Sequence, residues 1–443
     1  MRVSTRSALP RDGFGRTAGE WDGLGLSRTA GQLVQELDAI LSERRVACVY
    51  QPIVDLETGA VVAYEALARG PRGSPLEHPE PLFEASRRAG RMAELDWLCR
   101  STAALGAVDG GLRAPWSLFV NVEPEALYKP VPQELRKSWL GASGRLRMVF
   151  EVTERTLTRD PTALLWNVGW ARDLGCGIAL DRVGSDPRAQ ALLAFLRPDV
   201  LKLDLRLLHG KSPGARAAIV HAIAAEAERT GATIAAMGIE TDAHLETASA
   251  AGATLGQGWR LGRPGPLPKP LPPLGASIRA GHPASSVPVG FTPFDMLRER
   301  RPIKRATKAV LRAMSRGLEH AALALREPPV VMATFQDDRF FSGASRDLYT
   351  CLGRSCAYVT AAGSGMSPGP ALGVRGVRLP SRDPLRAEWV VVVQGSRFSA
   401  ALAARDLGDE GPDRDRRFDY VMTHERDLVT NVARTLLARA MTV

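Results

Sequence analysis

Residues 176–186 read CGIALDRVGSD: a short apolar run ends at Asp181, and a cation, Arg182, follows directly. A continuous apolar run between turn residues is typical of a strand buried on both faces of a parallel sheet. A carboxylate at the carboxyl end of such a strand occupies the place where α/β barrels carry their functional residues. The stretch therefore predicts a buried strand with a site at its end, and Arg182 stands where a further metal ligand would be expected.

Similar apolar runs recur on both sides of this stretch and alternate with helical patterns. Amphipathic spacing predicts helices over 33–43, 81–105 and 214–231. Strands that alternate with helices over some 230 residues favour an α/β fold with a largely parallel sheet. Eight runs make a closed (β/α)8 barrel of the TIM type the simplest arrangement, with strands expected within 45–54, 59–67, 116–122, 146–152, 176–181, 199–204, 232–237 and 258–264.

The chain outside the barrel divides into three further parts. Residues 1–30 lack periodicity and read as a flexible leader, and the barrel is expected over 31–267. Residues 268–290 are rich in proline and predict a stiff linker. Residues 291–443 carry their own helical and strand patterns, which predict a smaller second α/β domain.

Composition narrows the function classes. The net charge of +10 comes mostly from arginine, and by itself it is weak support for nucleic-acid binding, which we do not expect. No apolar run is long enough to span a membrane, so no membrane span is expected. Five scattered cysteines without a CxxC pair fit a reducing compartment, and the expected location is the cytoplasm.

The polar residues that end the apolar runs form a candidate metal site. Three carboxylates and an amide at one barrel mouth are hard oxygen ligands, which suit Mg²⁺ or Mn²⁺ better than zinc. A lysine beside them would orient a water molecule or a phosphate oxygen. Any one of these residues alone would more often be a strand-end or capping residue, and the hypothesis rests on the whole set: Glu65, Asn121, Glu151, Asp181 and Lys202, with Gln257 at the entry to the last expected strand.

Residues 31–267 resemble the EAL domain, the family of cyclic-di-GMP phosphodiesterases and their non-catalytic relatives. The matching segments occur in the family's order: YQPIVDLETG, YEALARG, FVNVEPEAL, FEVTE, ALD, DVLKLD, GIET and GQGWRLGRP. The resemblance implies that Glu65, Asn121, Glu151 and Asp181 bind one metal ion. It implies that Lys202 contacts the attacking water and that Gln257 supports the site. It also implies that Gln51 and Arg69 hold the guanine and phosphate of cyclic-di-GMP, and that Glu154 steadies the loop after Asp181.

Two positions depart from the family pattern. Where the family reads DDFGTG, residues 181–186 read DRVGSD, so Arg182 replaces the aspartate that serves a second metal ion. Where the family reads AEGVET, the chain reads AMGIET, so Met237 replaces a glutamate of the same half of the site. A guanidinium about 4 Å from a divalent ion would repel it by roughly 8 kcal/mol at an effective dielectric constant near 20. A thioether is a poor ligand for Mg²⁺ and cannot act as a base at neutral pH.

Three interpretations follow from these departures. Arg182 could pair with a phosphate of the dinucleotide, which would turn the enzyme into a receptor that binds cyclic-di-GMP with little or no hydrolysis. Alternatively, Arg182 turns away and pairs with Asp186, and the protein is a working phosphodiesterase that gives linear pGpG. In the third interpretation, the barrel binds no nucleotide and docks a protein signalling partner. A homodimer is compatible with all three.

The second domain resembles the DICT domain, a sensory module found beside diguanylate cyclase, EAL and two-component modules. The resemblance rests on FTPFDML, MATFQDDRFF, GVRGVRLPSRDPLRAEWVVVV and RRFDYVMTHERDLV. Its polar residues could line a ligand pocket or could form salt bridges that hold the fold: Arg375, Asp383, Glu388, Trp389, Arg405, Asp406 and Asp419. Residues 298–316 form a basic helical stretch, which is usually a solvated face and less often a membrane or nucleic-acid contact.

Overall fold

The computed structural model describes residues 30–126, 129–184, 186–209, 211–278, 291–410 and 412–440. The expected leader, apart from its last residue, and part of the expected linker lie outside these ranges. Within them, no helix is both long and apolar enough to cross a membrane. All five cysteines are free thiols.

Eight strands close into a barrel in sequence order, which confirms the predicted architecture. The first strand is antiparallel to both of its neighbours, and the other neighbouring pairs are parallel. The barrel strands are β1 (Ala47–Asp55), β2 (Val61–Arg69), β3 (Ser117–Asn121), β4 (Arg147–Thr153), β5 (Gly177–Val183), β6 (Val200–Asp204), β7 (Thr233–Met237) and β8 (Leu255–Gln257).

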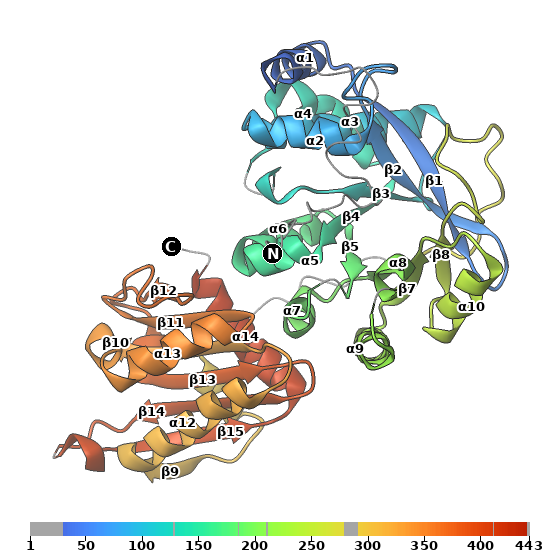
Figure 1. Cartoon of the computed structure of the whole chain (residues 1–443). Coiled ribbons are helices and arrows are strands. Elements are labelled where there is room, and N and C mark those ends of the chain that lie inside the picture. The colour runs from blue at the N-terminus through green and yellow to red at the C-terminus, as the bar shows by residue number, and fades with distance from the viewer. Residues whose placement is uncertain are drawn as a thin grey trace, which may run out of the picture.

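Helices surround this barrel in the upper part of Figure 1. They are α1 (Ala30–Ser42), α2 (Pro79–Arg88), α3 (Met92–Asp109), α4 (Gln133–Ser143), α5 (Glu154–Arg159), α6 (Pro161–Asp173), α7 (Ala189–Leu196), α8 (Leu205–His209), α9 (Pro213–Thr230) and α10 (Asp242–Ala250). The single helix predicted over 81–105 is two helices, because the chain turns at Gly90, whose φ of 67° favours glycine. A short 3₁₀ turn, η3 (Pro124–Ala126), follows β3.

The position of the last strand was predicted wrongly. It was expected within 258–264, but β8 ends at Gln257. Gly258 lies directly against the backbone of Ile239, where a Cβ atom would be 2.1 Å from the carbonyl oxygen. Residues 258–264 therefore turn away from the sheet, and Gln257 lies at the end of the last strand instead of its entry.

The proline-rich segment begins on the barrel surface. The Gly275 N–H donates to the Val61 carbonyl at 3.0 Å, and Leu267 packs beside Gly110. Ile278 is buried with Val62, Val149 and other residues inside the barrel. The segment expected to be a free linker from residue 268 is thus held on the barrel as far as Ile278, because its apolar side chains find a place in the barrel core.

The second domain is built on a seven-stranded sheet in the order β12-β11-β10-β13-β14-β15-β9. Its elements are α11 (Pro293–Arg298), β9 (Lys304–Thr307), α12 (Lys308–Ala324), β10 (Val330–Asp337), η4 (Asp338–Phe340), α13 (Ala344–Ser355), β11 (Tyr358–Ser364), β12 (Arg375–Arg378), η5 (Pro384–Ala387), β13 (Glu388–Gln394), β14 (Ser399–Asp406), η6 (Asp413–Asp415), β15 (Arg417–Thr423) and α14 (Arg426–Ala440).

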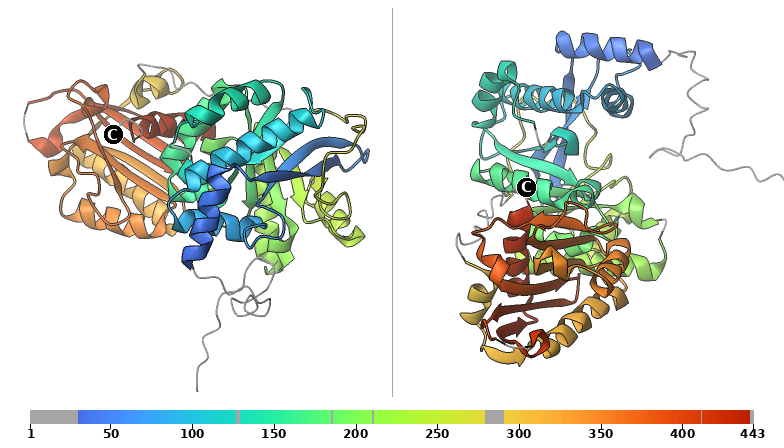
Figure 2. Two further views of the ribbon diagram at one scale, coloured as in Figure 1. Left: turned by 90° about the horizontal axis from the view of Figure 1, so that it is seen from above. Right: turned by 90° about the vertical axis from the view of Figure 1, so that its left-hand side faces the viewer.

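The two faces of this sheet belong to different hydrophobic cores. Val331 and Val391 point to a core shared with Leu311 of α12 and Leu352 of α13. The alternate residues of the same strands point to a core that contains α14 and continues into the barrel domain. The order of layers is therefore α12 and α13, the sheet, α14, and then the barrel, as Figures 1 and 2 show.

The two domains meet at helices α6, α7 and α9 of the barrel, where Arg229 on α9 pairs with Asp427 on α14 at 3.2 Å. The Arg434 guanidinium on α14 donates to the carbonyl oxygens of Ala194 and Phe195 on α7, at 3.1 and 3.2 Å. The hydroxyls of Thr162 on α6 and Tyr358 on β11 are 2.6 Å apart. The second domain thus contacts the helices that precede and follow β5.

Candidate functional site

Side chains from inside three strands, β2, β4 and β6, form a buried ion cluster. The Lys202 ammonium on β6 is 2.9 Å from Glu65 Oε2 on β2 and forms a second ion pair with Glu151 on β4. Lys202 is 1% exposed and Glu151 is equally buried. Buried charges are costly unless they are paired, so loss of one partner would leave an uncompensated charge in the barrel.

The pKa directions follow from one ammonium shared by several carboxylates. Burial acts against the charge on Lys202, but Glu151, Glu65 and Asp181 outweigh it and raise the pKa of the lysine. Burial also acts on Glu65, but the charge of Lys202 outweighs it and lowers the pKa of this carboxyl. The pKa of Glu151 is raised by burial and by the neighbouring charge of Glu65. Lys202 and Glu65 therefore stay charged, and Glu151 takes up a proton most readily.

Amide side chains complete the ring of predicted site residues. Asn121 donates to Glu65 Oε1 at 3.3 Å. Gln257 donates to Gln51 Oε1 at 3.2 Å, and Gln51 in turn donates to the Gly262 carbonyl at 3.0 Å. Arg69, four residues after Glu65, is half-buried and donates to the Ala68 carbonyl at 2.7 Å. Gln51 thus belongs to the cluster, whereas no described contact joins Arg69 to it.

The departure at Arg182 lies in a bulge of β5. The pairing of β5 with β6 shifts between Leu180 and Val183, and Arg182 has a positive φ of 55°. Its side chain is 66% exposed, with Nε 3.9 Å from the Asp181 carboxylate. Together with Asn121, Arg182 lines an outer cavity of about 580 Å³ between the barrel wall and helices α2 and α3.

The alternative pairing of Arg182 with Asp186 is wrong. Asp186 is held instead by the Arg188 guanidinium, which donates to both carboxylate oxygens at 2.8 to 3.2 Å. The short separation of Asp186 and Arg188 along the chain favours this pair. The Arg182 guanidinium is instead mostly exposed, beside Asp181 and at the edge of the outer cavity.

Met237 ends β7 between two other mouth residues. It pairs in register with Asp204 on β6 and with Gln257 on β8. Asp204 is a buried carboxylate that we did not select from the sequence, and it pairs with Arg206 at 2.9 Å. Its place as the last residue of the run DVLKLD was the signal that could have identified it.

Two buried oxygens of the cluster bear on whether a cation fits there. Glu151 Oε2 and Gln257 Oε1 are buried and have no hydrogen-bond partner. Such orphaned oxygens are costly unless a ligand or ion satisfies them. In the arrangement described, however, no three Asp, Glu, His or Cys residues are close enough together to hold a metal ion. The Lys202 ammonium occupies the space between two of the carboxylates, so a cation would have to bind beside it.

Glu154 anchors the loop after β5. Its carboxylate, at the start of α5, is fully buried and accepts from the backbone N–H groups of Gly184 and Asp186 at 2.9 and 2.7 Å. The loop that carries Arg182 is therefore tied to α5, which leads directly into α6.

Glu154→Gln should lower the free energy of unfolding by about 1–3 kcal/mol, because an amide N–H₂ group would then face a backbone N–H and leave a buried donor unpaired. Urea unfolding measures the change. Glu246→Gln, on the outside of α10, removes an exposed carboxylate and should have little effect. Equal stability of the Glu154 variant and the wild type would contradict the anchoring role.

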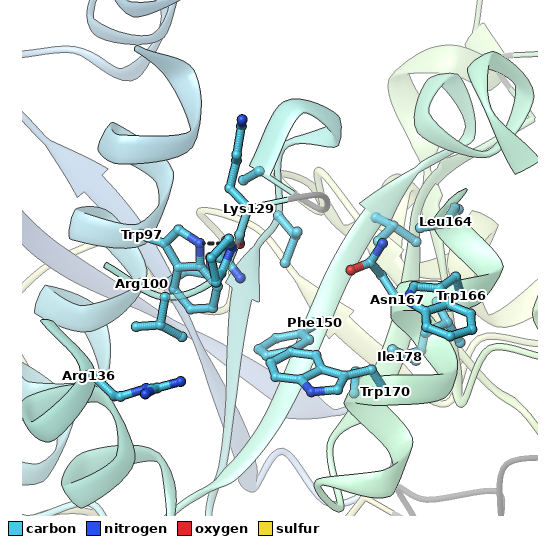
Figure 3. Close-up of a pocket in the computed structure, with 17 residues that line it drawn as sticks. Trp97, Arg100, Lys129, Arg136, Phe150, Leu164, Trp166, Asn167, Trp170 and Ile178 are labelled. Carbon is cyan, nitrogen blue, oxygen red and sulfur yellow. Dashed lines mark hydrogen bonds between the residues drawn. The ribbon is translucent and has the colours of Figure 1, made fainter. Parts of the chain in front are cut away.

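A second cavity lies on the outer wall of the barrel, between α4 and α6 (Figure 3). It measures about 410 Å³. Trp97 and Arg100 lie on one side of it and Trp166 and Trp170 on the other, and Trp97 donates to the Lys129 carbonyl at 3.0 Å. None of the residues predicted for the site lines this cavity.

The polar residues suggested for a pocket in the second domain serve the fold instead. Glu388 is fully buried and accepts from Phe294 N–H at 3.1 Å and from Arg405 at 2.7 Å. The remaining charged residues form ion pairs with the following partners: Asp383 with Arg439, Asp406 with Arg416, Asp419 with Arg305, and Arg375 with Asp160. Trp389 alone of the suggested set lines a cavity described for this domain.

Residues 34–264 match the family model of the EAL domain. The chain belongs to the EAL-domain family. Residues 295–407 of this EAL-domain protein match the DICT model, described as a sensory domain in diguanylate cyclases and two-component systems. Both resemblances read from the sequence are confirmed.

The EAL-domain protein is similar to several curated proteins over its barrel. It is 31% identical over 253 residues to the bifunctional diguanylate cyclase/cyclic di-GMP phosphodiesterase MucR of Pseudomonas aeruginosa. This match covers 53% of this chain and 35% of MucR. It is 27% identical over 226 residues to the cyclic di-GMP phosphodiesterase RocR of the same species, covering 49% of this chain and 57% of RocR. The chain thus spans only part of these relatives.

Solved structures align with the barrel as well. A MucR phosphodiesterase in complex with cyclic-di-GMP is 29% identical, with a TM-score of 0.47, and the match covers 54% of this chain and all of that one. The EAL domain of FimX from Pseudomonas aeruginosa bound to cyclic-di-GMP is 22% identical, with a TM-score of 0.45, and the match covers 53% of this chain and 96% of that one.

Proposed function

We propose that this chain is a cyclic-di-GMP signalling protein whose barrel mouth binds the dinucleotide, with at most one Mg²⁺ or Mn²⁺ ion, and hydrolyses it weakly or not at all. The observation that carries the proposal is the composition of one half of the mouth. At the ends of β5 and β7, where a second cation would need carboxylates, the chain has Arg182 and Met237. Relatives named as cyclic-di-GMP phosphodiesterases support the choice of ligand.

The chemistry of phosphodiester cleavage explains why the site would still bind cyclic-di-GMP after losing the ability to hydrolyse it. Cleavage of a phosphodiester by two metal ions needs one cation near the attacking water and one near the leaving oxygen. A single ion, held by Glu65, Asn121, Glu151 and Asp181, would polarise a phosphate oxygen. Lys202 would hold a water molecule or a phosphate oxygen, and Gln257 and Glu154 would keep the ligands and the loop in place. Without the second ion, the leaving oxygen loses its stabilisation.

The remaining polar residues of the mouth suit a bound dinucleotide. Gln51 has its amide directed into the cluster, and Arg69 supplies a cation at the end of β2. The exposed guanidinium of Arg182 can form two parallel hydrogen bonds to a phosphate, which compensates in part for a missing ion. We therefore assign Gln51 to a guanine and both arginines to phosphate groups.

We also propose that the DICT domain acts on the barrel through α6 and α7. Its contacts at Thr162 and at the end of α7 lie on either side of β5 and of the loop that Glu154 anchors. A signal that moves α14 would therefore shift the loop that carries Arg182.

Free thiols at all five cysteines support the cytoplasmic location that we expected.

A calorimetric titration of cyclic-di-GMP into the full chain, with Mn²⁺ present, tests the proposal. We expect micromolar or tighter binding, with no linear pGpG detected when the same samples are separated chromatographically. Rapid formation of pGpG would favour the active phosphodiesterase, for which the orphaned oxygens of Glu151 and Gln257 are the supporting observation. Neither binding nor product would leave the docking scaffold as the remaining interpretation.

A further inference from the structure

We infer that a cavity in the DICT domain, between α12 and α13 and above strands β10 and β13, binds a small planar aromatic molecule that carries one anionic group. The cavity measures about 290 Å³. This is at the small end of the range for ligand pockets, so it suits a ring system of one or two rings. It is distinct from the barrel mouth and does not depend on the function proposed there.

The floor of the cavity holds a polar atom without a partner. Ser315 is 3% exposed, lines the cavity from α12, and its hydroxyl makes no hydrogen bond in the described structure. Burying a hydroxyl without a partner costs free energy, so a hydrogen bond from this hydroxyl to a ligand atom would be favourable. Glu319, one turn later, is 7% exposed and accepts from the Tyr349 hydroxyl at 2.8 Å. The floor thus offers a free hydroxyl beside a carboxyl that is already engaged.

The walls of the cavity are aromatic. Phe335, Phe340 and Trp389 line it, and Phe335 packs edge-on against Tyr349 with ring centroids 5.1 Å apart. The pairing of β10 with β11 shifts between Thr334 and Asp337, and this bulge sets the directions of Phe335 and Gln336. Rings fixed by such packing favour a flat apolar ligand.

The rim of the cavity is positively charged. Lys308, Arg312, Arg316 and Arg339 line it. Lys308 is paired with Asp413, and Arg339 lies 3.6 Å from Asp337. Arg312 makes no ion pair with any residue of the described ranges. Arg316 is close enough to help lower the pKa of Glu319, although burial outweighs this effect and raises it. Two cations are therefore available for an anionic group at the mouth of an aromatic pocket.

The location of the cavity fits a sensor. Helices α12 and α13 cover the face of the sheet that points away from the barrel, and α14 covers the face that contacts it. Neighbouring residues of β13 reach both layers: Val391 lines the cavity, and Val390 packs in the core with α14. A ligand between α12 and α13 would thus press on strands whose other face supports the contact with the barrel.

Calorimetry of the full chain with 2-naphthoate tests this assignment, with the neutral naphthalene-2-carboxamide as the matched probe. We expect 2-naphthoate to bind at least about tenfold more tightly than the amide, because a charge-assisted hydrogen bond is stronger than a neutral one. The double variant Arg312→Gln and Arg316→Gln should remove this preference. Arg354→Gln, which removes an exposed cation from α13, should leave it unchanged. Equal binding of the two probes, no binding of either, or full binding to the double variant would overturn the proposal.

Ser315→Ala separates a binding role from a structural one. The substitution removes an unpaired buried hydroxyl, adds no atom, and places a better helix former in α12, so the unliganded variant should unfold at the same or a higher temperature than the wild type. Its affinity for 2-naphthoate should fall several-fold at the same time. A lower unfolding temperature with unchanged affinity would show that the hydroxyl serves the fold alone, and would overturn its assignment to the ligand.

Discussion

The double variant Arg182→Asp and Met237→Glu is expected to hydrolyse cyclic-di-GMP at least about 100-fold faster than the wild type. A rise of this size corresponds to roughly 3 kcal/mol of transition-state stabilisation, which is within what a bound cation supplies. The substitutions place two carboxylates at the ends of β5 and β7, beside Asp181 and Gln257. Appearance of pGpG with time, at several Mn²⁺ concentrations, measures the effect.

The local backbone favours this experiment. Arg182 has a positive φ of 55°, a conformation that aspartate tolerates better than most side chains. The new carboxylates would also lie close to Asp204 and to the existing acids, so the variant should depend on metal ions for stability as well as for turnover.

Arg155→Asp is the matched control for this variant, because Arg155 lines the same outer cavity as Arg182 without lying on a strand end. It should leave turnover at the level of the wild type. If the wild type already cleaves cyclic-di-GMP as fast as the double variant does, the interpretation of Arg182 and Met237 is wrong.

Lys202→Met is expected to destabilise the protein by about 3–5 kcal/mol in metal-free buffer, because it removes the shared partner of two buried carboxylates. The methionine fills a similar volume, so the loss would come from the uncompensated charges of Glu65 and Glu151. Protonation of Glu151, whose pKa is already raised, would recover part of the stability as the pH falls. Urea unfolding in the presence of a chelator measures the change.

Mn²⁺ should restore much of the stability of this variant, since a divalent ion can take the place of the ammonium between the carboxylates. The wild type should gain less, because Lys202 already occupies that space. Lys137→Met, on the exposed side of α4, is the control and should change neither stability nor the response to metal. A Lys202 variant as stable as this control would contradict the central role of the ion cluster.

The separation of the two cores in the DICT domain bears on how a signal would travel. The sheet has one face toward α12 and α13 and the other toward α14 and the barrel. Strand β13 pairs with β10 and β14 at the centre of the sheet, so a displacement on one face is transmitted to the other with little lateral freedom. The two ligand sites proposed here, at the cavity and at the barrel mouth, would be linked through this sheet.

The amino-acid sequence predicted the barrel, the second domain and the polar residues of the barrel mouth. It could do so because buried strands and amphipathic helices leave patterns a few residues long, and because motifs such as YEALARG and DVLKLD keep fixed spacing. The resemblance to the EAL family identified Arg182 and Met237 as departures. Such local patterns did not predict where β8 ends, because that boundary depends on the contact of Gly258 with the backbone of Ile239.

Which of these side chains contact one another depends on the three-dimensional fold. The pairing of Lys202 with both Glu65 and Glu151 depends on strands far apart in the chain. The direction of Arg182 depends on a bulge, and the partner of Asp186 is the nearby Arg188 instead of Arg182. The packing of Ile278 in the barrel and the cavity around Ser315 likewise bring together segments distant in sequence. Contacts of this kind follow from register and packing in three dimensions, which no local pattern of residues records.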